Sequence, residues 1–303
     1  MIDFQRFDLS KKQEYDRYLQ NCGERGCEYS FTNLNLWGRQ KAAFVDGYLV
    51  LFSQFERRSV YPYPIGSGDI KPVLDAIIQD AQERGIVCRL SGLLPDDCIT
   101  LEELYPGRFQ FHPDRNSCDY VYSIDDLADL KGRKYQKKRN HLNRFRENHP
   151  DCRVVPITKE NMAAVENMTE QWYAARMAED IHDDYHLEQR AIHRAFCHWE
   201  ELGLEGLALE EKGQILAMTI GSLLTADTFD IHFEKALEDV DGAYNAINQA
   251  FAAYLREKHQ ELRFLNREDD MGLPGLRKAK MSYNPHHLVV KFWARLWEDD
   301  DED

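Results

Sequence analysis

The 303-residue chain has a formal charge of −15, from 53 acidic and 38 basic side chains, and 43% of its residues are hydrophobic. This composition is typical of a folded globular protein, and the length predicts two domains that each bury a core. The acidity argues against broad, nonspecific attraction to nucleic acid or anionic lipid, although a local basic patch could still bind either.

The chain shows no signal for export or membrane insertion. No window approaches the about 20 apolar residues needed to cross a bilayer, and the N-terminus is charged where a signal peptide would be apolar. The seven cysteines lack a C-x-x-C spacing, which fits free thiols better than disulfides or a thiolate metal site. We therefore expect a cytoplasmic protein without a transmembrane segment.

The first half begins with short helices and then a hairpin. Two apolar runs at 41–45 and 48–53 flank Asp46-Gly47, a pair that favours a tight hairpin turn. A helix is expected over 70–84, ending at Gly85, followed by a strand at 86–90 and a short helix at 96–105.

Residues 130–148 form the most basic segment of the chain and are predicted to be helical. On a helix, four polar residues fall on one side, opposite Tyr135, Leu142 and Phe145; these are Arg133, Lys137, Asn140 and Arg144. The stripe could bind phosphates, or it could be an ordinary solvated face. Arg139 lies nearer the apolar side, where its guanidinium would need a carboxylate or a ligand phosphate as partner.

The second half, after a domain boundary expected at Pro150, again mixes a hairpin, helices and returning strands. Strands are expected at 153–156, 206–210, 214–223, 228–233, 262–265 and 287–296, and helices at 159–179, 187–202, 243–258 and 276–283. This order predicts an α/β (α+β) protein of two similarly built domains, 1–150 and 151–297, followed by an acidic, disordered tail at 298–303.

Three runs carry a resemblance to a known family: LKGRKYQKKRNHLNRF, HFEKALEDVDGAYNAIN and LNREDDMGLPGLRKAKMSYNP. They resemble the family named for the C-terminal domain of phosphatidylglycerol lysyltransferase, which is related to the Fem-type aminoacyltransferases. The resemblance implies tandem, duplicated GCN5-related N-acetyltransferase-like domains with mixed central sheets and a channel between the halves. It also implies aminoacyl-tRNA as a candidate donor. No membrane-embedded flippase domain is present in this sequence, so the resemblance does not imply a lipid acceptor.

Lys280 matches the lysine of this family's F-K-x-x-F-x-P signature, with Ala279 in place of the first aromatic residue and Tyr283 in place of the second. The resemblance therefore places Lys280 at the reaction centre. Arg277, on the same predicted helix, would help Lys280 to stabilise an oxyanion or to hold a donor phosphate.

Acidic groups near two strand ends are further candidates. Glu268 and Asp269 follow a buried strand, where they could face a ligand or merely cap the turn and neutralise nearby cations. His232 and Glu234 alternate on one strand, so either could accept a proton from an attacking amine or hydroxyl; the alternative is a polar strand face under a loop.

The turn Asp241-Gly242-Ala243 opens a helix whose unpaired amides favour an anion, and Asn245 follows in the same candidate binding site. Acyl-CoA is a candidate donor here, but the acidic residues around the turn repel a pyrophosphate. No cofactor is predicted with certainty, and no metal is predicted, although His182, His186 and His193 have helical spacing.

These observations predict a soluble acyl- or aminoacyltransferase that passes an activated carboxyl group to an amine or hydroxyl. Lys280, Glu234 and His232 would form its reaction centre, and the basic helix would contact a phosphate-bearing donor. The alternative is a noncatalytic ligand-binding protein that retains the same fold.

Overall fold

The protein is described by a computed structural model that covers residues 1–20, 22, 25–55, 58–179 and 183–297. The chain forms two compact units. Unit 1 contains residues 1–119, 269–272 and the C-terminal segment from 289, and unit 2 contains residues 120–268 and 273–288. The division therefore falls at 119/120 and not at Pro150, so the basic segment packs within unit 2. The predicted tail at 298–303 lies outside the described residues.

Unit 1 is built on an eight-stranded sheet in the order β1-β2-β3-β4-β6-β15-β7, with β5 paired to β3. Its strands are β1 Gln5–Arg6, β2 Gln40–Val45, β3 Tyr48–Phe55, β4 Arg58–Pro62, β5 Ile65–Gly66, β6 Arg89–Leu93, β7 Phe109–Pro113 and β15 Phe292–Leu296. Its helices are α1 Lys12–Leu19, α2 Phe31–Trp37, α3 Lys71–Arg84 and α4 Pro95–Leu104.

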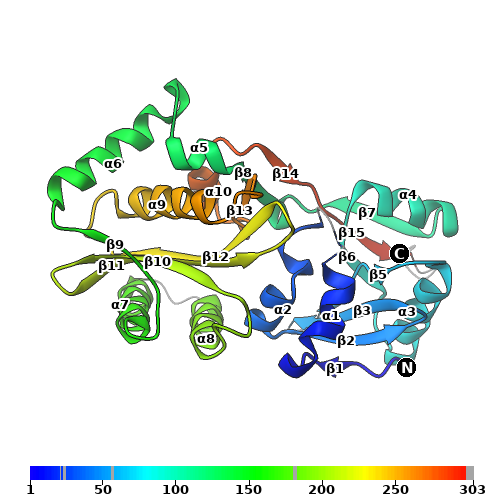
Figure 1. The fold of residues 1–303 in the computed structure, drawn as a ribbon. Coiled ribbons are helices and arrows are strands. Elements are labelled where there is room, and N and C mark those ends of the chain that lie inside the picture. The colour runs from blue at the N-terminus through cyan, green and yellow to red at the C-terminus, as the bar shows by residue number, and fades with distance from the viewer. Residues whose placement is uncertain (21, 23–24, 56–57, 180–182, 298–303) are drawn as a thin grey trace. The chain divides into compact units, whose positions relative to one another are not determined.

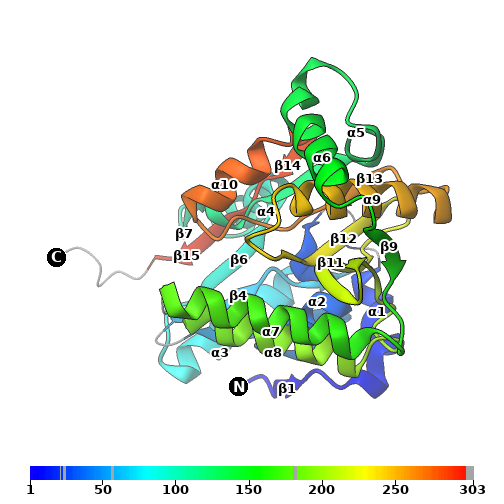
Figure 2. The ribbon, with the colours of Figure 1, turned by 90° about the vertical axis from the view of Figure 1, so that its left-hand side faces the viewer.

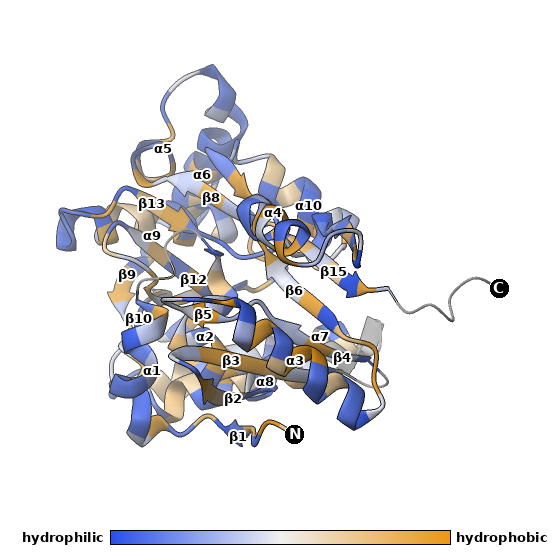
Figure 3. Ribbon diagram, turned by 90° about the vertical axis from the view of Figure 1, so that its right-hand side faces the viewer, coloured by the Kyte–Doolittle hydropathy of each residue, from blue (hydrophilic) through white to orange (hydrophobic). Residues whose placement is uncertain are grey.

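The predicted hairpin of unit 1 is confirmed as β2 and β3. Asp46 and Gly47 have φ values of 46° and 81°, the left-handed pair that a two-residue hairpin turn requires. The apolar side of α3, including Val73 and Ile77, packs on the inner residues of β3, which Figure 3 shows as mostly hydrophobic. Burial of these faces forms the core of unit 1.

Unit 2 is built on a seven-stranded sheet in the order β14-β8-β13-β12-β11-β10-β9. Its strands are β8 Asp119–Ser123, β9 Arg153–Pro156, β10 Glu205–Glu211, β11 Gln214–Leu223, β12 Thr228–Ala236, β13 Phe264–Asn266 and β14 His287–Val289. Its helices are α5 Ile124–Asp129, α6 Gln136–Asn148, α7 Met162–Glu179, α8 Asp183–Cys197, α9 Ala243–Lys258 and α10 Pro274–Met281. Helix α9 covers one face of the sheet and α7 and α8 cover the other (Figures 1 and 2).

The core of unit 2 lies between α9 and the sheet. Ile247, Phe251 and Leu255 form the buried side of α9, and the ring of Phe251 meets Phe229 of β12 edge-on at 5.8 Å. An apolar helix stripe against a sheet face is the usual way to stabilise such a layer. This packing fixes the side chains of α9 that point toward the end of β12.

The mixed α/β class and the two mixed sheets agree with the sequence prediction. Several boundaries differ, among them the following three. The helix expected at 130–148 starts at Gln136, after a turn at Gly132 with φ 87°. Strand β6 begins at Arg89 and not at residue 86. The closing strand is two strands, because β14 and β15 belong to different sheets.

Lys291 lies between these last two strands and is buried in unit 1. Its Nζ is 2.7 Å from Asp119 Oδ1 and also ion-pairs with Glu28, while the backbone N–H of Cys27 donates to Asp119 Oδ2 at 2.7 Å. Burial alone would lower the pKa of Lys291, but the two carboxylates raise it well above its ordinary value. The ammonium therefore stays charged and holds the C-terminal segment against the N-terminal region of unit 1.

No helix within the described parts of the chain combines the length and the apolar character required to cross a membrane.

We predict that Lys291→Met lowers the free energy of unfolding by about 3–5 kcal/mol, because the fully buried Asp119 and the partly buried Glu28 would be left without a cation. Urea denaturation measures the change. Lys131→Met is the matched control, since Lys131 is 82% exposed and its ion pair with Asp129 should contribute little. A loss below about 1 kcal/mol for Lys291→Met would show that the cluster does not anchor the segment.

Candidate functional site

The candidate site lies in unit 2, where β12 and β13 separate. These parallel strands pair only through Thr228–Phe264, Phe229–Leu265 and Asp230–Asn266. Strand β12 continues to Ala236 beyond this pairing, whereas the chain leaves β13 after Asn266. Polar side chains from β12, α9, α10 and α6 meet beside this separation.

Glu234 of β12 and Arg267, the residue after β13, form a buried ion pair. Arg267 Nη2 is 2.8 Å from Glu234 Oε1, and their side chains are 13% and 10% exposed. Asn248 of α9 donates its Nδ2 to Glu234 Oε2 at 3.2 Å. Burial would lower the pKa of Arg267, but Glu234 raises it, so the guanidinium remains charged.

Two tyrosines surround the Arg267 guanidinium. Its carbon lies 5.1 Å from the ring centre of Tyr283 and 5.7 Å from that of Tyr122, which are cation–π distances. Asn245 of α9 donates to the Tyr283 hydroxyl at 2.7 Å. Burial raises the pKa of Tyr283, so its hydroxyl stays neutral at physiological pH.

Lys138 of α6 reaches the same tyrosine. Its Nζ lies 3.7 Å from the ring centre of Tyr283 and donates to Ser282 Oγ at 2.7 Å. Burial, followed by the charge of Arg267, lowers the pKa of Lys138 to about 8. Lys138 is therefore an amine that can release and accept a proton near neutral pH.

Lys280, the predicted signature lysine, is buried on α10. Its Nζ donates to the backbone carbonyl of Arg267 at 2.5 Å and lies 5.7 Å from the ring centre of Tyr120. The Tyr122 hydroxyl donates to the Lys280 carbonyl at 2.9 Å, which holds the end of α10 against β8. The ammonium is thus attached to the residue that pairs with Glu234.

His232 belongs to an adjoining cluster. Its ring contacts Ser222 Oγ at 2.9 Å, Glu268 Oε1 at 3.1 Å and Asp230 Oδ2 at 3.5 Å. The predicted common face of His232 and Glu234 assumed regular alternation, but the β11–β12 register shifts at this point: Ile220 pairs with Phe233 and Gly221 with Ile231. His232 is the extra residue of a bulge, so its hydrogen bonds are separate from those of Glu234.

Asp230, His232 and Glu268 offer ligand atoms that all lie within 4.8 Å of one another. This is the donor set in the described part of unit 2 that best matches a divalent-cation site, with one imidazole and two carboxylates. Glu268 enters it with a left-handed backbone, φ 55°, which turns its side chain toward His232.

The basic stripe is exposed as predicted, at Arg133, Lys137, Asn140 and Arg144. Arg144 Nη1 is 2.7 Å from Asp241 Oδ2, and Asn140 accepts from Gln136 at 2.8 Å. The prediction that Arg139 needs a carboxylate or phosphate was wrong. Its guanidinium donates to the carbonyls of Leu130 and Gly132 and to Gln136, so it caps the preceding turn.

The turn 241–243 does open α9, with Gly242 at φ 83°. Helix α6 covers it, because a Cβ on Gly242 would lie 2.5 Å from the His141 carbonyl oxygen and 3.0 Å from Phe145 Cβ. The Asp241 carboxylate faces Arg144 and His141. The side of this turn that contacts α6 is therefore filled by the protein itself.

The remaining predicted residues are dispersed. Asp269 belongs to unit 1, where its carboxylate accepts from the Met271 amide at 3.0 Å, and Arg277 is half-buried on α10. Of the three histidines with helical spacing, His182 lies outside the described residues. His193 contacts Glu166 at 2.6 Å on α7.

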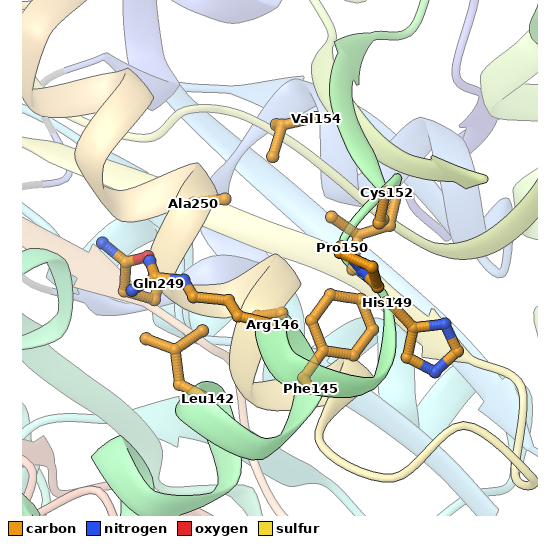
Figure 4. A pocket seen from close by; sticks show the side chains of 11 residues that line it. Leu142, Phe145, Arg146, His149, Pro150, Cys152, Val154, Gln249 and Ala250 are labelled. Carbon is orange, nitrogen blue, oxygen red and sulfur yellow. The ribbon is translucent and has the colours of Figure 1, made fainter.

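A small hollow of about 180 Å³ opens between α6, α9 and β9 (Figure 4). Its lining is largely apolar but includes Arg146, His149 and Gln249, and it contains none of the predicted site residues. This hollow is therefore separate from the Glu234 region.

Sequence reasoning missed the central roles of Arg267, Asn248 and Lys138. Lys138 had an available signal: it follows Tyr135 by three residues and precedes Leu142 by four, which places it on the buried side of α6. Arg267 lies among the polar residues that follow a buried strand, but its pairing with Glu234 cannot be inferred from their spacing in the sequence.

We predict that one lysine of the protein titrates near pH 8. Reductive ¹³C-methylation followed by NMR titration should show one dimethyl-lysine resonance with this pKa, because burial and Arg267 disfavour the charged amine. Lys138→Met should remove that resonance, and the exposed Lys131→Met control should not. If all lysine resonances titrate near 10.4, Lys138 is not perturbed.

Comparisons with known proteins agree with this architecture. The family model described as phosphatidylglycerol lysyltransferase, C-terminal, matches residues 20–295. A curated relative, an uncharacterized protein of Mycoplasmoides gallisepticum, is 25% identical over 60% of this chain, and the match spans 57% of that relative's length.

Several solved structures are similar to this chain over nearly its whole length. A conserved protein of unknown function from Bacteroides thetaiotaomicron is 36% identical, with a TM-score of 0.91 over 98% of this chain and 100% of that one. L-PGS from Bacillus licheniformis is 14% identical, with a TM-score of 0.67 over 96% and 93%. FemX is 11% identical, with a TM-score of 0.63 over 98% of both chains. A tandem GNAT protein of clavulanic acid biosynthesis, 7% identical, aligns with a TM-score of 0.52 over 99% and 100%.

The expected tandem GNAT-like fold is therefore confirmed, and the chain belongs to the family of the phosphatidylglycerol lysyltransferase C-terminal domain.

Proposed function

We propose that this protein is an acyltransferase that uses aminoacyl-tRNA as donor, with acyl-CoA as a less favoured donor, and passes the activated carboxyl group to an amine or hydroxyl. The main supporting observation is the buried Lys280 ammonium, attached to the backbone of Arg267 beside the Glu234–Arg267 ion pair. Membership in a family named for a lysyltransferase supports the aminoacyl donor. The acceptor is an amine or hydroxyl compound whose identity the transfer assay below will reveal.

The reaction needs a positive charge near the developing oxyanion and a group that accepts the nucleophile's proton. The acceptor's nitrogen or oxygen attacks the ester carbonyl, the carbonyl oxygen becomes an oxyanion, and the tRNA 3′-terminal ribose hydroxyl leaves. Lys280 has the fixed charge suited to the oxyanion. Glu234 retains its proposed place at the reaction centre, where its carboxylate is ion-paired with Arg267.

Two further groups can support the proton transfer. The Lys138 amine, with a pKa of about 8, can accept a proton near neutral pH. The His232 side chain is fully buried, so any proton that it accepts would have to pass through its hydrogen-bond partner Glu268. Arg277 remains a proposed donor-binding residue on the same helix as Lys280.

The exposed basic stripe, formed by Arg133 in the turn before α6 and by Lys137, Asn140 and Arg144 of α6, is the proposed contact with the donor's phosphates. Within the described residues, Arg133 and Lys137 lack a carboxylate partner such as Asp241 provides for Arg144, so they are the stronger phosphate candidates. A local basic stripe on a chain of charge −15 would restrict the nucleic acid to one surface.

A binding protein without catalysis is the second candidate. It is favoured by the engagement of Glu234 by Arg267 and of His232 by Glu268, since neither group is left as a ready base. The transfer assay below separates the two candidates.

We predict that Lys280→Met lowers transfer from radiolabelled aminoacyl-tRNA to components of a source-cell extract by at least about 100-fold, because the oxyanion loses its charge partner. Lys278→Met is the control, since Lys278 is exposed on the same helix and should keep wild-type activity. Wild-type rates for Lys280→Met would contradict the assigned role. Donor binding without transfer from any aminoacyl-tRNA or acyl-CoA would favour the binding protein.

We also predict that tRNA binding weakens steeply with salt and that this dependence originates in α6. Fluorescence anisotropy between 50 and 300 mM KCl should give a slope of log K against log salt that falls by roughly 0.7–0.9 for each lost phosphate contact. Arg133→Ala and Lys137→Ala should each reduce it. Lys212→Ala, an exposed lysine in the β10–β11 turn, should leave the slope unchanged. Equal slopes in all variants would show that the stripe does not contact the tRNA phosphates.

A further inference from the structure

Three buried polar atoms around Glu234 have no hydrogen-bond partner within the described residues: Thr219 Oγ1, Asn248 Oδ1 and Arg267 Nη1. Thr219 and Asn248 are 0% and 4% exposed. Buried polar atoms are almost always hydrogen-bonded, and leaving one unpaired costs free energy. Three such atoms beside one carboxylate indicate a place prepared for a polar group that the protein alone does not supply.

All three residues adjoin Glu234 from different elements. Thr219 of β11 is directly opposite Glu234 in the antiparallel register, so the two side chains share a face of the sheet. Asn248 of α9 lies over that face and donates its Nδ2 to Glu234 Oε2. Arg267 holds the other carboxylate oxygen through Nη2, which leaves Nη1 available.

The available atoms define the chemistry of the missing group. The Asn248 amide oxygen and the Glu234 carboxylate are acceptors, and the Thr219 hydroxyl can accept, whereas Arg267 Nη1 can only donate. The Asn248 amide orientation is fixed, because exchanging its two ends would direct its oxygen at the Glu234 carboxylate. A complementary group therefore presents several N–H donors next to one oxygen acceptor.

A primary ammonium beside a carbonyl has this pattern. An ammonium has three N–H donors and no acceptor, which suits three acceptors, one of them charged. A phosphate has only acceptors and would be repelled by Glu234 and by the Asn248 oxygen. An acetyl methyl has no donor at all.

We propose that Thr219, Asn248 and Glu234 bind the α-ammonium of an aminoacyl donor, while Arg267 Nη1 donates to its carbonyl oxygen. This inference rests on the proposed function and makes it more specific: these residues would select an aminoacyl group over a simple acyl group. Thr219 and Asn248 are specificity determinants in this assignment, and Glu234 supplies the charge.

The test uses stable donor analogues with the full-length protein. Amides of 3′-amino-3′-deoxyadenosine with each of the twenty amino acids mimic the aminoacylated tRNA end, and their N-acetyl forms lack the ammonium. Isothermal titration calorimetry measures both series, and free amino acids form a third arm. We expect at least one amide to bind and its N-acetyl form to bind at least about tenfold more weakly.

The variants separate recognition from folding. Thr219→Val removes the unpartnered hydroxyl at nearly constant shape, so it should leave the melting temperature unchanged or raise it. It should nevertheless weaken binding of the aminoacyl amide by about tenfold. Thr169→Val is the matched control: Thr169 is also buried in unit 2, but its hydroxyl already donates to the Glu166 carbonyl at 2.7 Å. It should lose stability without changing the preference for the free amine. Asn248→Ala provides a second variant and should reduce the same preference.

The possible results are distinct. Equal binding of amides and N-acetyl amides would overturn the ammonium site while leaving the transferase proposal intact. Binding of free amino acids as tight as that of the amides would assign the site to free amino acids and overturn the donor role. Failure of every amide to bind, together with no transfer from any aminoacyl-tRNA, would overturn both the inference and the proposed function.

Discussion

The buried ion pair between Glu234 and Arg267 is the constraint on which the candidate site depends. Its two residues come from the end of β12 and from the segment after β13, and Asn248 attaches it to α9. Removing either charge would leave the other largely buried without a counter-charge, at a cost of several kcal/mol. The same pair therefore closes the open end of the sheet and sets the electrostatics of the site, so function and stability are coupled there.

The short pairing between β12 and β13 explains why polar groups can enter the core of unit 2. A longer parallel pairing would bury the end of β12 against another strand and would require apolar side chains there. The pairing instead stops at Asp230–Asn266, and the space beyond it is occupied by charged and amide groups that satisfy one another only in part. The packing of α9 against β10, β11 and β12 holds Asn248 beside these groups.

Much of the fold could be predicted from the sequence, because it depends on local patterns. Strand β11 and helix α9 have the predicted bounds, since alternation and the helical stripe are both strong there. The bulge at His232 could not be predicted, because one extra residue changes the phase of a strand without changing its composition. The placement of β14 and β15 in separate sheets could not be predicted either, because strand pairing with distant parts of the chain decides it, and Lys291 between them likewise pairs with the distant Asp119.

The site was predicted in its residue types more than in its contacts. Lys280 and Glu234 both contact Arg267, Lys280 at its backbone carbonyl and Glu234 at its guanidinium, and this shared partner was not predicted. The sequence indicated that the Arg139 guanidinium needs a partner. The partners are backbone carbonyls, and a sequence does not show which carbonyls will lie within reach. Pairing in three dimensions decides which charges remain available, and only local pairs can be inferred from spacing.

Helix α6 contributes residues to both the proposed donor-binding surface and the proposed reaction centre. One side carries the exposed Lys137 and Arg144, with Arg133 in the turn just before the helix, and the other side carries Lys138, whose amine lies over Tyr283. An anion bound to the exposed side would favour a protonated Lys138, while Arg267 and burial oppose it. Because Tyr283 also contacts Arg267, any change in the charge of Lys138 acts on the ion pair through one shared ring. Donor binding on the surface and electrostatics at the reaction centre are thus linked by a single helix and a single tyrosine.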